Sequence, residues 1–159
     1  MAVILCMLIS MFIHVSSIIF FPIYFLIEKK YSKKKLITLL LIAIPFSFFN
    51  FKSIFSDYLS FMPSFIAHKV DIYTQLEADE NIGFTFSVAF RLFIVLLIIF
   101  FKKEEFYKDK MSLTVFNIYY FGLLFYLIFN SFPQLGNRGS LYFQQFEIIL
   151  IPLLIYSFK

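Results

Sequence analysis

Five long apolar segments, separated by short charged ones, decide what this chain can fold into. A helix needs roughly 20 apolar residues to cross a bilayer. The segments reach that length or approach it, and they cover residues 3–27, 36–51, 84–101, 113–132 and 140–158. Hydrophobic residues make up 61% of the 159 residues, and so small a globule cannot bury that much apolar surface. We therefore predict an all-α, polytopic transmembrane helix bundle that forms one integral membrane domain over residues 1–159.

Lysines are distributed unevenly among the segments that connect the predicted spans. Residues 28–35 contain five lysines and residues 102–110 contain four, whereas residues 52–83 contain two lysines and five acidic residues. Loops rich in lysine and arginine stay on the cytoplasmic side of a membrane. The pattern predicts that the first two loops are cytoplasmic and that the third is outside. The amino terminus is then outside and the carboxy terminus inside.

The first predicted span begins directly at Met1, with no hydrophilic residue ahead of it. A signal peptide would need a basic start, a shorter apolar core and a small-residue cleavage site, and this stretch has none of them. An outer terminus with nothing before it is typical of a chain that has lost earlier spans or whose start was misassigned. We therefore expect a fragment of a larger protein.

The outer loop at residues 52–83 carries apolar residues at helical spacing, which a flexible linker would lack. One stripe comprises Phe51, Ile54, Phe55, Tyr58, Leu59 and Met62, and a second comprises Ile66, Val70 and Tyr73. We predict two amphipathic helices that lie in the outer membrane interface. His68, Asp71 and Glu77 then face water or a partner surface.

Two charges lie inside predicted spans. Arg91 and Glu147 are each about eight residues below the outer ends of their spans, which places both about 12 Å deep. Charges at that depth face the bundle interior and have a partner, so we expect an ion pair between them. The pair could serve a function or only the structure, and an unpaired arginine could instead extend to the surface.

Arg138 lies at the water boundary between Gly136 and Gly139. Glycines let the backbone adopt unusual dihedral angles and approach a ligand, and the planar guanidinium suits phosphate oxygens. On a helix that starts near Gly139, Tyr142 and Gln145 follow at near-helical spacing. The alternative is an interfacial anchor in an ordinary turn.

His14 interrupts the first predicted span, and its position makes it a candidate functional residue. No spacing typical of metal ligands accompanies it, so we expect neither a metal nor a cofactor. The chain contains no zinc-protease motif, no phosphate-binding loop and no nucleophile elbow. The lysine runs are better explained by topology than by nucleic-acid binding.

Three stretches resemble a known family. They are "FIHVSSIIFFPIYFLI", "KVDIYTQLEADENIGFTF" and above all "GNRGSLYFQQFEIILIPLLI". Together they resemble the carboxy-terminal half of the EpsG family, Wzy-like membrane proteins of exopolysaccharide and O-antigen polymerisation. The resemblance places Arg138 in the family's arginine position and His14 in its histidine position.

The resemblance implies a glycosyltransferase-type polymerase of the bacterial cytoplasmic membrane. Such a protein joins polyprenyl-diphosphate-linked oligosaccharides outside the membrane, alongside other polysaccharide-assembly proteins of the bilayer. This chemistry needs cations that hold the leaving diphosphate and a base or hydrogen-bond acceptor beside the acceptor sugar. Arg138 suits the first role by the resemblance and Arg91 by its depth alone. His68, Asp71 or Glu77 could serve the second role by their predicted place in the outer loop. Tyr142, Gln145 and His14 would contact the substrate.

Two other classes of function fit the same residues. A small transporter or channel subunit would use Arg91, Glu147 and His14 as an ion or proton path. A membrane assembly subunit without catalytic activity would need none of them.

Overall fold

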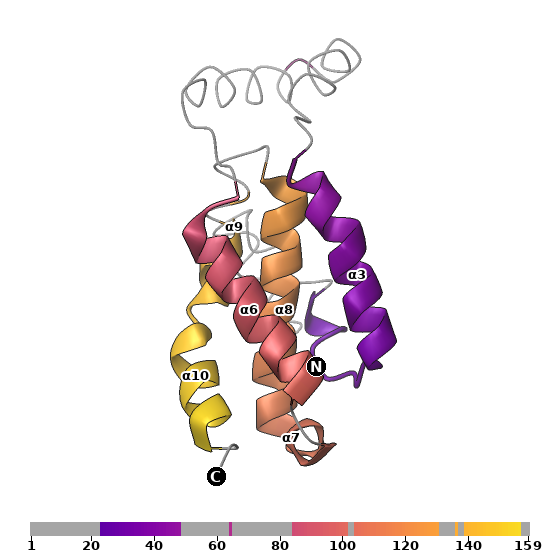
Figure 1. Cartoon of the computed structure of the whole chain (residues 1–159), viewed down its shortest axis with the longest axis vertical. Coiled ribbons are helices and arrows are strands. Elements are labelled where there is room, and N and C mark those ends of the chain that lie inside the picture. Colours follow the sequence, from indigo (N-terminus) through magenta and orange to yellow (C-terminus); the bar gives the residue numbers. More distant parts are fainter. Residues whose placement is uncertain are drawn as a thin grey trace.

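The computed structural model describes residues 23–48, 64, 84–101, 104–130, 136 and 139–156. Most of these residues are helical, and strands are not found among them. The helices are α3 (Lys33–Phe46), α6 (Phe86–Phe101), α7 (Glu104–Lys108), α8 (Lys110–Phe129), α9 (Gly139–Gln144) and α10 (Glu147–Tyr156). The predicted all-α class is confirmed for this part of the chain (Figure 1).

Helix α8 is the centre of the bundle. It packs against α3, α6, α7, α9 and α10, and Figure 1 shows α6 crossing it. The largest fully buried side chains include Phe116, Tyr119 and Tyr120 of α8. Burial of such large rings supplies most of the packing area in a small bundle. Every other described helix is therefore positioned by its contact with α8.

Polar side chains of α8 bind backbone carbonyls on and beside α3. Asn117 Nδ2 donates to the carbonyls of Ile27 and Lys29, at 2.7 and 2.9 Å. The Tyr120 hydroxyl donates to the carbonyl of Leu36 at 2.7 Å. Because a buried donor without a partner is costly, these contacts fix the position of α3 against α8.

Further contacts set the relative direction of α3 and α8. Asn130 Nδ2, at the end of α8, donates to the carbonyl of Ser47 at 3.1 Å, just after α3. At the other end, Lys110 Nζ lies 3.0 Å from Glu28 Oε1. The two helices therefore run parallel, and the described parts of both lysine-rich segments lie at the same end of the bundle.

Local sequence signals explain where α3 and α8 begin and end. Ser32 caps α3 by accepting from the backbone N–H of Lys35 at 3.4 Å. Asp109 caps α8 through Oδ2, which accepts from the hydroxyl and the backbone N–H of Ser112. These two hydrogen bonds hold the pKa of the Asp109 carboxyl below its usual range. Pro45 lies in the last turn of α3; it has no N–H to donate to a carbonyl one turn earlier, and the helix ends at the next residue, Phe46.

Helices α8 and α9 approach each other at a glycine. A Cβ added to Gly122 would overlap the Cβ of Phe143, a fully buried residue of α9. Small residues at such contacts let helix backbones come close together, as in membrane bundles. Gly122 therefore sets how near α9 lies to the central helix.

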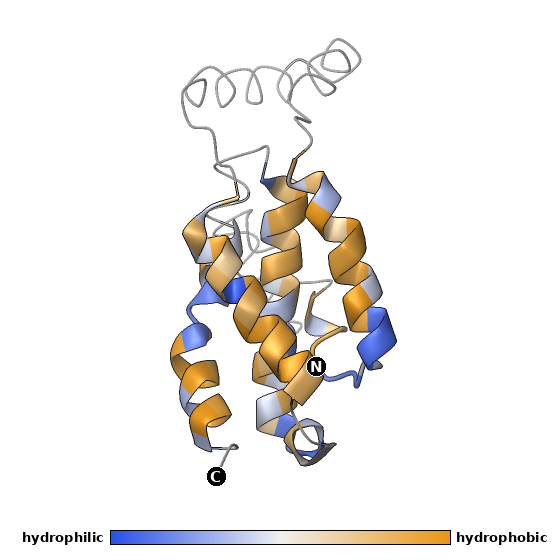
Figure 2. Ribbon diagram, viewed as in Figure 1, coloured by the Kyte–Doolittle hydropathy of each residue, from blue (hydrophilic) through white to orange (hydrophobic). Residues whose placement is uncertain are grey.

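Within the described part of the chain, two helical stretches are long and apolar enough to cross a membrane. They are α8, with 20 residues, and the continuous stretch Gly139–Tyr156, with 18 residues. Helix α6 is apolar but shorter, with 16 residues. Figure 2 shows that hydrophobic residues dominate the helices, and that hydrophilic ones gather at the start of α3 and around the α9–α10 junction.

Apolar side chains also cover much of the outside of the described bundle. Phe86, Phe90, Phe93 and Phe100 of α6 form an exposed stripe at helical spacing. Exposed apolar surface of this extent marks contact with a membrane or with another protein. Together with the apolar helices, it indicates a membrane protein.

The observed helix bounds differ from the predicted ones most at α3, at α8 and in the last span. Helix α3 runs from Lys33, after its Ser32 cap, to Phe46, whereas the predicted span is 36–51. Helix α8 begins at Lys110, three residues before the predicted span, because Asp109 caps it. The predicted span 140–158 is divided into α9 and α10. The predicted span 3–27 lies outside the described residues except for its last five, and the outer loop 52–83, with its predicted helices, does so except for Ser64.

Candidate functional site

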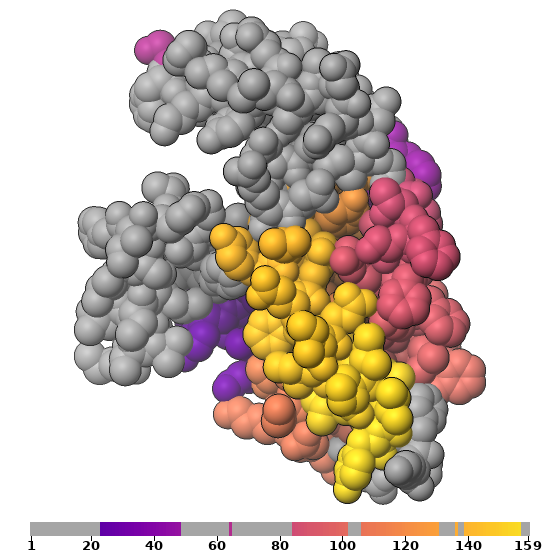
Figure 3. Space-filling view, turned by 90° about the vertical axis from the view of Figure 1, so that its left-hand side faces the viewer, coloured from indigo at the N-terminus to yellow at the C-terminus, as the bar shows by residue number. Residues whose placement is uncertain are grey.

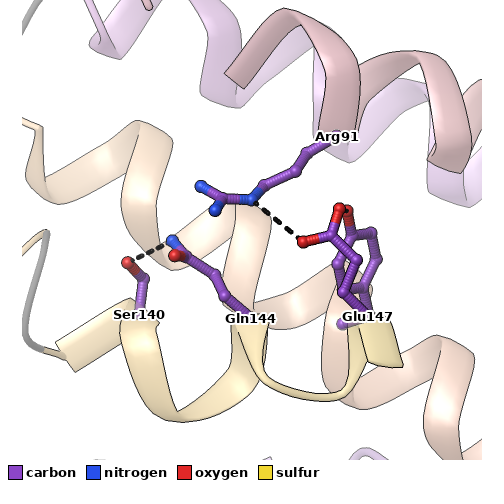
Figure 4. Close-up of polar contacts among 5 residues, drawn as sticks. Arg91, Ser140, Gln144 and Glu147 are labelled. Atoms are coloured by element: carbon purple, nitrogen blue, oxygen red, sulfur yellow. Dashed lines mark hydrogen bonds and ion pairs between the residues drawn. The ribbon is translucent and has the colours of Figure 1, made fainter. Parts of the chain in front are cut away.

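Arg91 and Glu147 lie together where α6 passes the start of α10 (Figure 4). Arg91 Nε is 3.8 Å from Glu147 Oε2. The two side chains are 17% and 22% exposed, so they are mostly shielded. Glu147 is in the first turn of α10, where the helix dipole favours an anion. The two charges expected from the sequence to be partners are thus brought together.

Tyr119 of α8 is the third member of this cluster. Its hydroxyl donates to Glu147 Oε1 at 3.1 Å, and the residue is only 2% exposed. The carboxylate is therefore held from two sides, by α8 through Oε1 and by α6 through Oε2. Sequence reasoning missed Tyr119, because nothing in the spacing separates it from the other tyrosines of α8.

A turn between α9 and α10 shapes the wall of the site. The backbone N–H of Phe146 donates to the carbonyl of Phe143, and that of Ile148 donates to the carbonyl of Gln145, each at 3.2 Å. These hydrogen bonds span three residues rather than four, so the chain tightens locally and α9 stops at Gln144. The turn carries the side chains of Gln144, Gln145 and Glu147 to the same region as Arg91.

A groove of about 570 Å³ lies between α6 and the α9–α10 stretch. Its polar lining is Arg91, Gln144, Gln145 and Glu147, and its apolar lining is Leu141, Ile148, Ile151 and Pro152. Figure 3 shows α9 and α10 lying beside α6 on an exposed face of the molecule. The groove can accept an amphiphile that has a polar group at Arg91 and an apolar part along α10.

Among the described residues, no hydrogen-bond partner is found for the guanidinium of Arg91. Its Nε is buried and makes no hydrogen bond to the described residues, since 3.8 Å is too long for one. Figure 4 shows the terminal nitrogens pointing toward Gln144 and away from Glu147. The Gln144 side chain in turn donates to Ser140 Oγ at 2.7 Å. An arginine in this state can bind a carboxylate or phosphate with two parallel hydrogen bonds.

The remaining predicted site residues are divided between the groove and the rest of the chain. Gln145 lines the groove, whereas Tyr142 is 46% exposed and is not among the lining residues. Arg138, His14, His68, Asp71 and Glu77 lie outside the described residues.

The described glycines of the Arg138 turn, Gly136 and Gly139, have ordinary backbone dihedral angles, since no described glycine has a positive φ. A side chain at Gly136 would clash, because a Cβ there would lie 2.7 Å from the carbonyl oxygen of Phe129. The backbone at Gly136 therefore packs tightly against the end of α8.

Comparison with known proteins agrees with these features. The model of the EpsG family matches residues 1–159, the whole chain. No curated protein and no solved structure matches the chain significantly. A match over the full length, together with the apolar helices, shows that the chain belongs to the EpsG family, which is linked to exopolysaccharide synthesis.

Proposed function

We propose that this chain serves as a membrane polysaccharide polymerase, joining polyprenyl-diphosphate-linked repeat units into exopolysaccharide, capsule or O-antigen. The observation that carries the proposal is the family match over residues 1–159. The groove supports it, because it offers a guanidinium and two amides beside an apolar wall. A lipid-linked diphosphate has the same division between an anionic head and an apolar tail.

The proposed topology has five spans in the bacterial cytoplasmic membrane, with the amino terminus outside and the carboxy terminus inside. The ion pair between Lys110 and Glu28 supports it, because both lysine-rich segments must then lie on the same side. The helices α3 and α8 correspond to the second and fourth proposed spans. Because successive spans cross the membrane in opposite directions, these two must run parallel, as α3 and α8 do.

In the proposed reaction, an acceptor sugar hydroxyl attacks the anomeric carbon of the donor glycan. The new glycosidic bond forms as the bond from that carbon to the carrier diphosphate breaks, and the diphosphate leaves with the electron pair. Arg138 and Arg91 hold the departing charge, as guanidinium groups do for phosphates. His68, Asp71 or Glu77 takes the proton from the acceptor hydroxyl. Tyr142, Gln145 and His14 contact the sugars or the carrier.

The proposal is tested by replacing Arg138 in the organism that carries this chain. Arg138→Ala should abolish high-molecular-weight polymer on gels, and Arg138→Lys should leave little, because lysine keeps the charge and loses the two-point hydrogen bond. Lys110→Ala is the matched control, since it removes one exposed cation at the start of α8. Polymer of normal length in Arg138→Ala, at normal protein level, would contradict the proposal. Proton-coupled uptake in vesicles would then favour a transporter.

A further inference from the structure

The contact between Arg91 and Glu147 is weaker than their charges allow. A free carboxylate beside a guanidinium closes onto it and forms two parallel hydrogen bonds at about 2.8 Å. Here a single pair of atoms approaches, Nε and Oε2, and it does so at 3.8 Å. Something must therefore hold the carboxylate back.

The structure identifies that restraint as the Tyr119 hydroxyl. Tyr119 is 2% exposed on the central helix α8, so its ring cannot move easily. Its hydroxyl donates to Glu147 Oε1 at 3.1 Å, on the carboxylate oxygen that is not the one nearest Arg91 Nε. A hydrogen bond to a charged acceptor is stronger than one between neutral groups. Another side chain beside the guanidinium, Gln144, is likewise held by a neighbour, Ser140.

We infer that Tyr119 is a positioning residue. By holding Glu147 away from a two-point pair with Arg91, its hydroxyl keeps the terminal nitrogens of Arg91 available to an oxyanion in the groove. Glu147 still neutralises part of the arginine charge, which lets the guanidinium remain shielded when the groove is empty. That the oxyanion is the diphosphate of a lipid-linked sugar rests on the proposed function.

Tyr119 and its neighbour Tyr120 provide a matched pair of variants. Both rings are buried on α8, and each loses only a hydroxyl when replaced by phenylalanine. The Tyr120 hydroxyl donates to the carbonyl of Leu36, toward α3. Tyr119→Phe therefore removes the restraint on Glu147, whereas Tyr120→Phe removes a hydrogen bond that does not involve the groove.

The test measures binding of a fluorescent short-chain prenyl diphosphate to the purified chain in detergent. The matched prenyl alcohol and inorganic diphosphate serve as competitors, which separate the contribution of the tail from that of the anion. Tyr119→Phe should weaken binding of the prenyl diphosphate about three- to tenfold, the range expected for one hydrogen bond. Tyr120→Phe should bind as the wild type does. In both variants the prenyl alcohol should compete as it does against the wild type.

A second comparison separates positioning from a merely structural effect. In the Glu147→Gln background there is no carboxylate to restrain, so adding Tyr119→Phe should leave binding unchanged. The inference is overturned if Tyr119→Phe binds like the wild type, if Tyr120→Phe weakens binding equally, if Tyr119→Phe weakens binding equally in both backgrounds, or if the wild type binds no prenyl diphosphate. Because this readout is binding alone, it is independent of whether Arg138→Ala abolishes polymer in cells.

Discussion

Arg91 of α6 and Glu147 of α10 form an ion pair on the wall of an otherwise mostly apolar groove, with 3.8 Å between Nε and Oε2. Removing either charge leaves the other shielded and without its partner. We expect Arg91→Gln and Glu147→Gln each to lower the free energy of unfolding by about 2–3 kcal/mol. The free energy of unfolding of the double variant should fall by less than the sum of the losses in the two single variants. Thermal unfolding in detergent measures all three.

The control for this pair is Glu28→Gln, which breaks the exposed ion pair with Lys110. Exposed pairs contribute little, so this variant should unfold like the wild type. Additive losses in the Arg91 and Glu147 double variant would show that the two charges do not interact.

Gly122→Ala should separate α8 from α9. The new methyl group would overlap the Cβ of Phe143, and neither backbone can shift without disturbing the buried contacts around it. Overpacking of this kind costs about 1–3 kcal/mol. A substitution by alanine at an exposed position of the same helix, Met111→Ala, should cost little. Identical unfolding of Gly122→Ala and the wild type would mean that the helices are not in such close contact.

The stability of the wild type relative to the Asp109→Asn variant should depend on pH. The hydrogen bonds of Asp109 with Ser112 lower the pKa of its carboxyl below the ordinary value of 3.8. A lowered folded-state pKa contributes stability above the unfolded pKa, and this is lost as the pH falls through the folded value. Asp109→Asn keeps a good capping residue but cannot titrate. The difference in the free energy of unfolding between the wild type and Asp109→Asn should be constant near neutral pH. Below about pH 4 the wild type should lose stability relative to Asp109→Asn, because its carboxylate becomes protonated.

The proposed topology predicts which positions react with an impermeant thiol reagent in intact cells. In a Cys6→Ala background, a cysteine at Lys33 should be protected, since it lies at the start of α3 in the lysine-rich segment. A cysteine at Ser64, in the outer loop, should be labelled. Labelling at position 33 together with protection at position 64 would contradict the proposed topology and indicate the opposite orientation in the membrane.

The helices and the charge pair could be predicted from the sequence because each depends on a single strong physical constraint. Apolar length identified the segments that became α6, α8 and the α9–α10 stretch. A charged residue in an apolar span is costly unless an opposite charge lies beside it. Because Arg91 and Glu147 lie at the same predicted depth, Glu147 was the expected partner of Arg91. These arguments need no knowledge of how the helices pack.

The rest of the site depends on packing between helices and could not be predicted in this way. The Tyr119 hydroxyl reaches Glu147 only because α8 lies at the centre of the bundle and its Tyr119 face is turned toward α10. The turn after Gln144 interrupts an apolar run that contains no glycine and no proline at that point. Gly136 serves a contact with Phe129 that only the fold creates.

The most direct test of the central claim, that the Arg91 groove serves glycan polymerisation, is the length of surface polysaccharide in cells that carry Arg91→Lys. Lysine keeps the positive charge beside Glu147 but loses the planar fork that binds a diphosphate at two points. We predict protein at the wild-type level and polymer that is shortened to a few repeat units or absent. Polymer of wild-type length from Arg91→Lys would contradict the claim and leave the ion pair with a structural role alone.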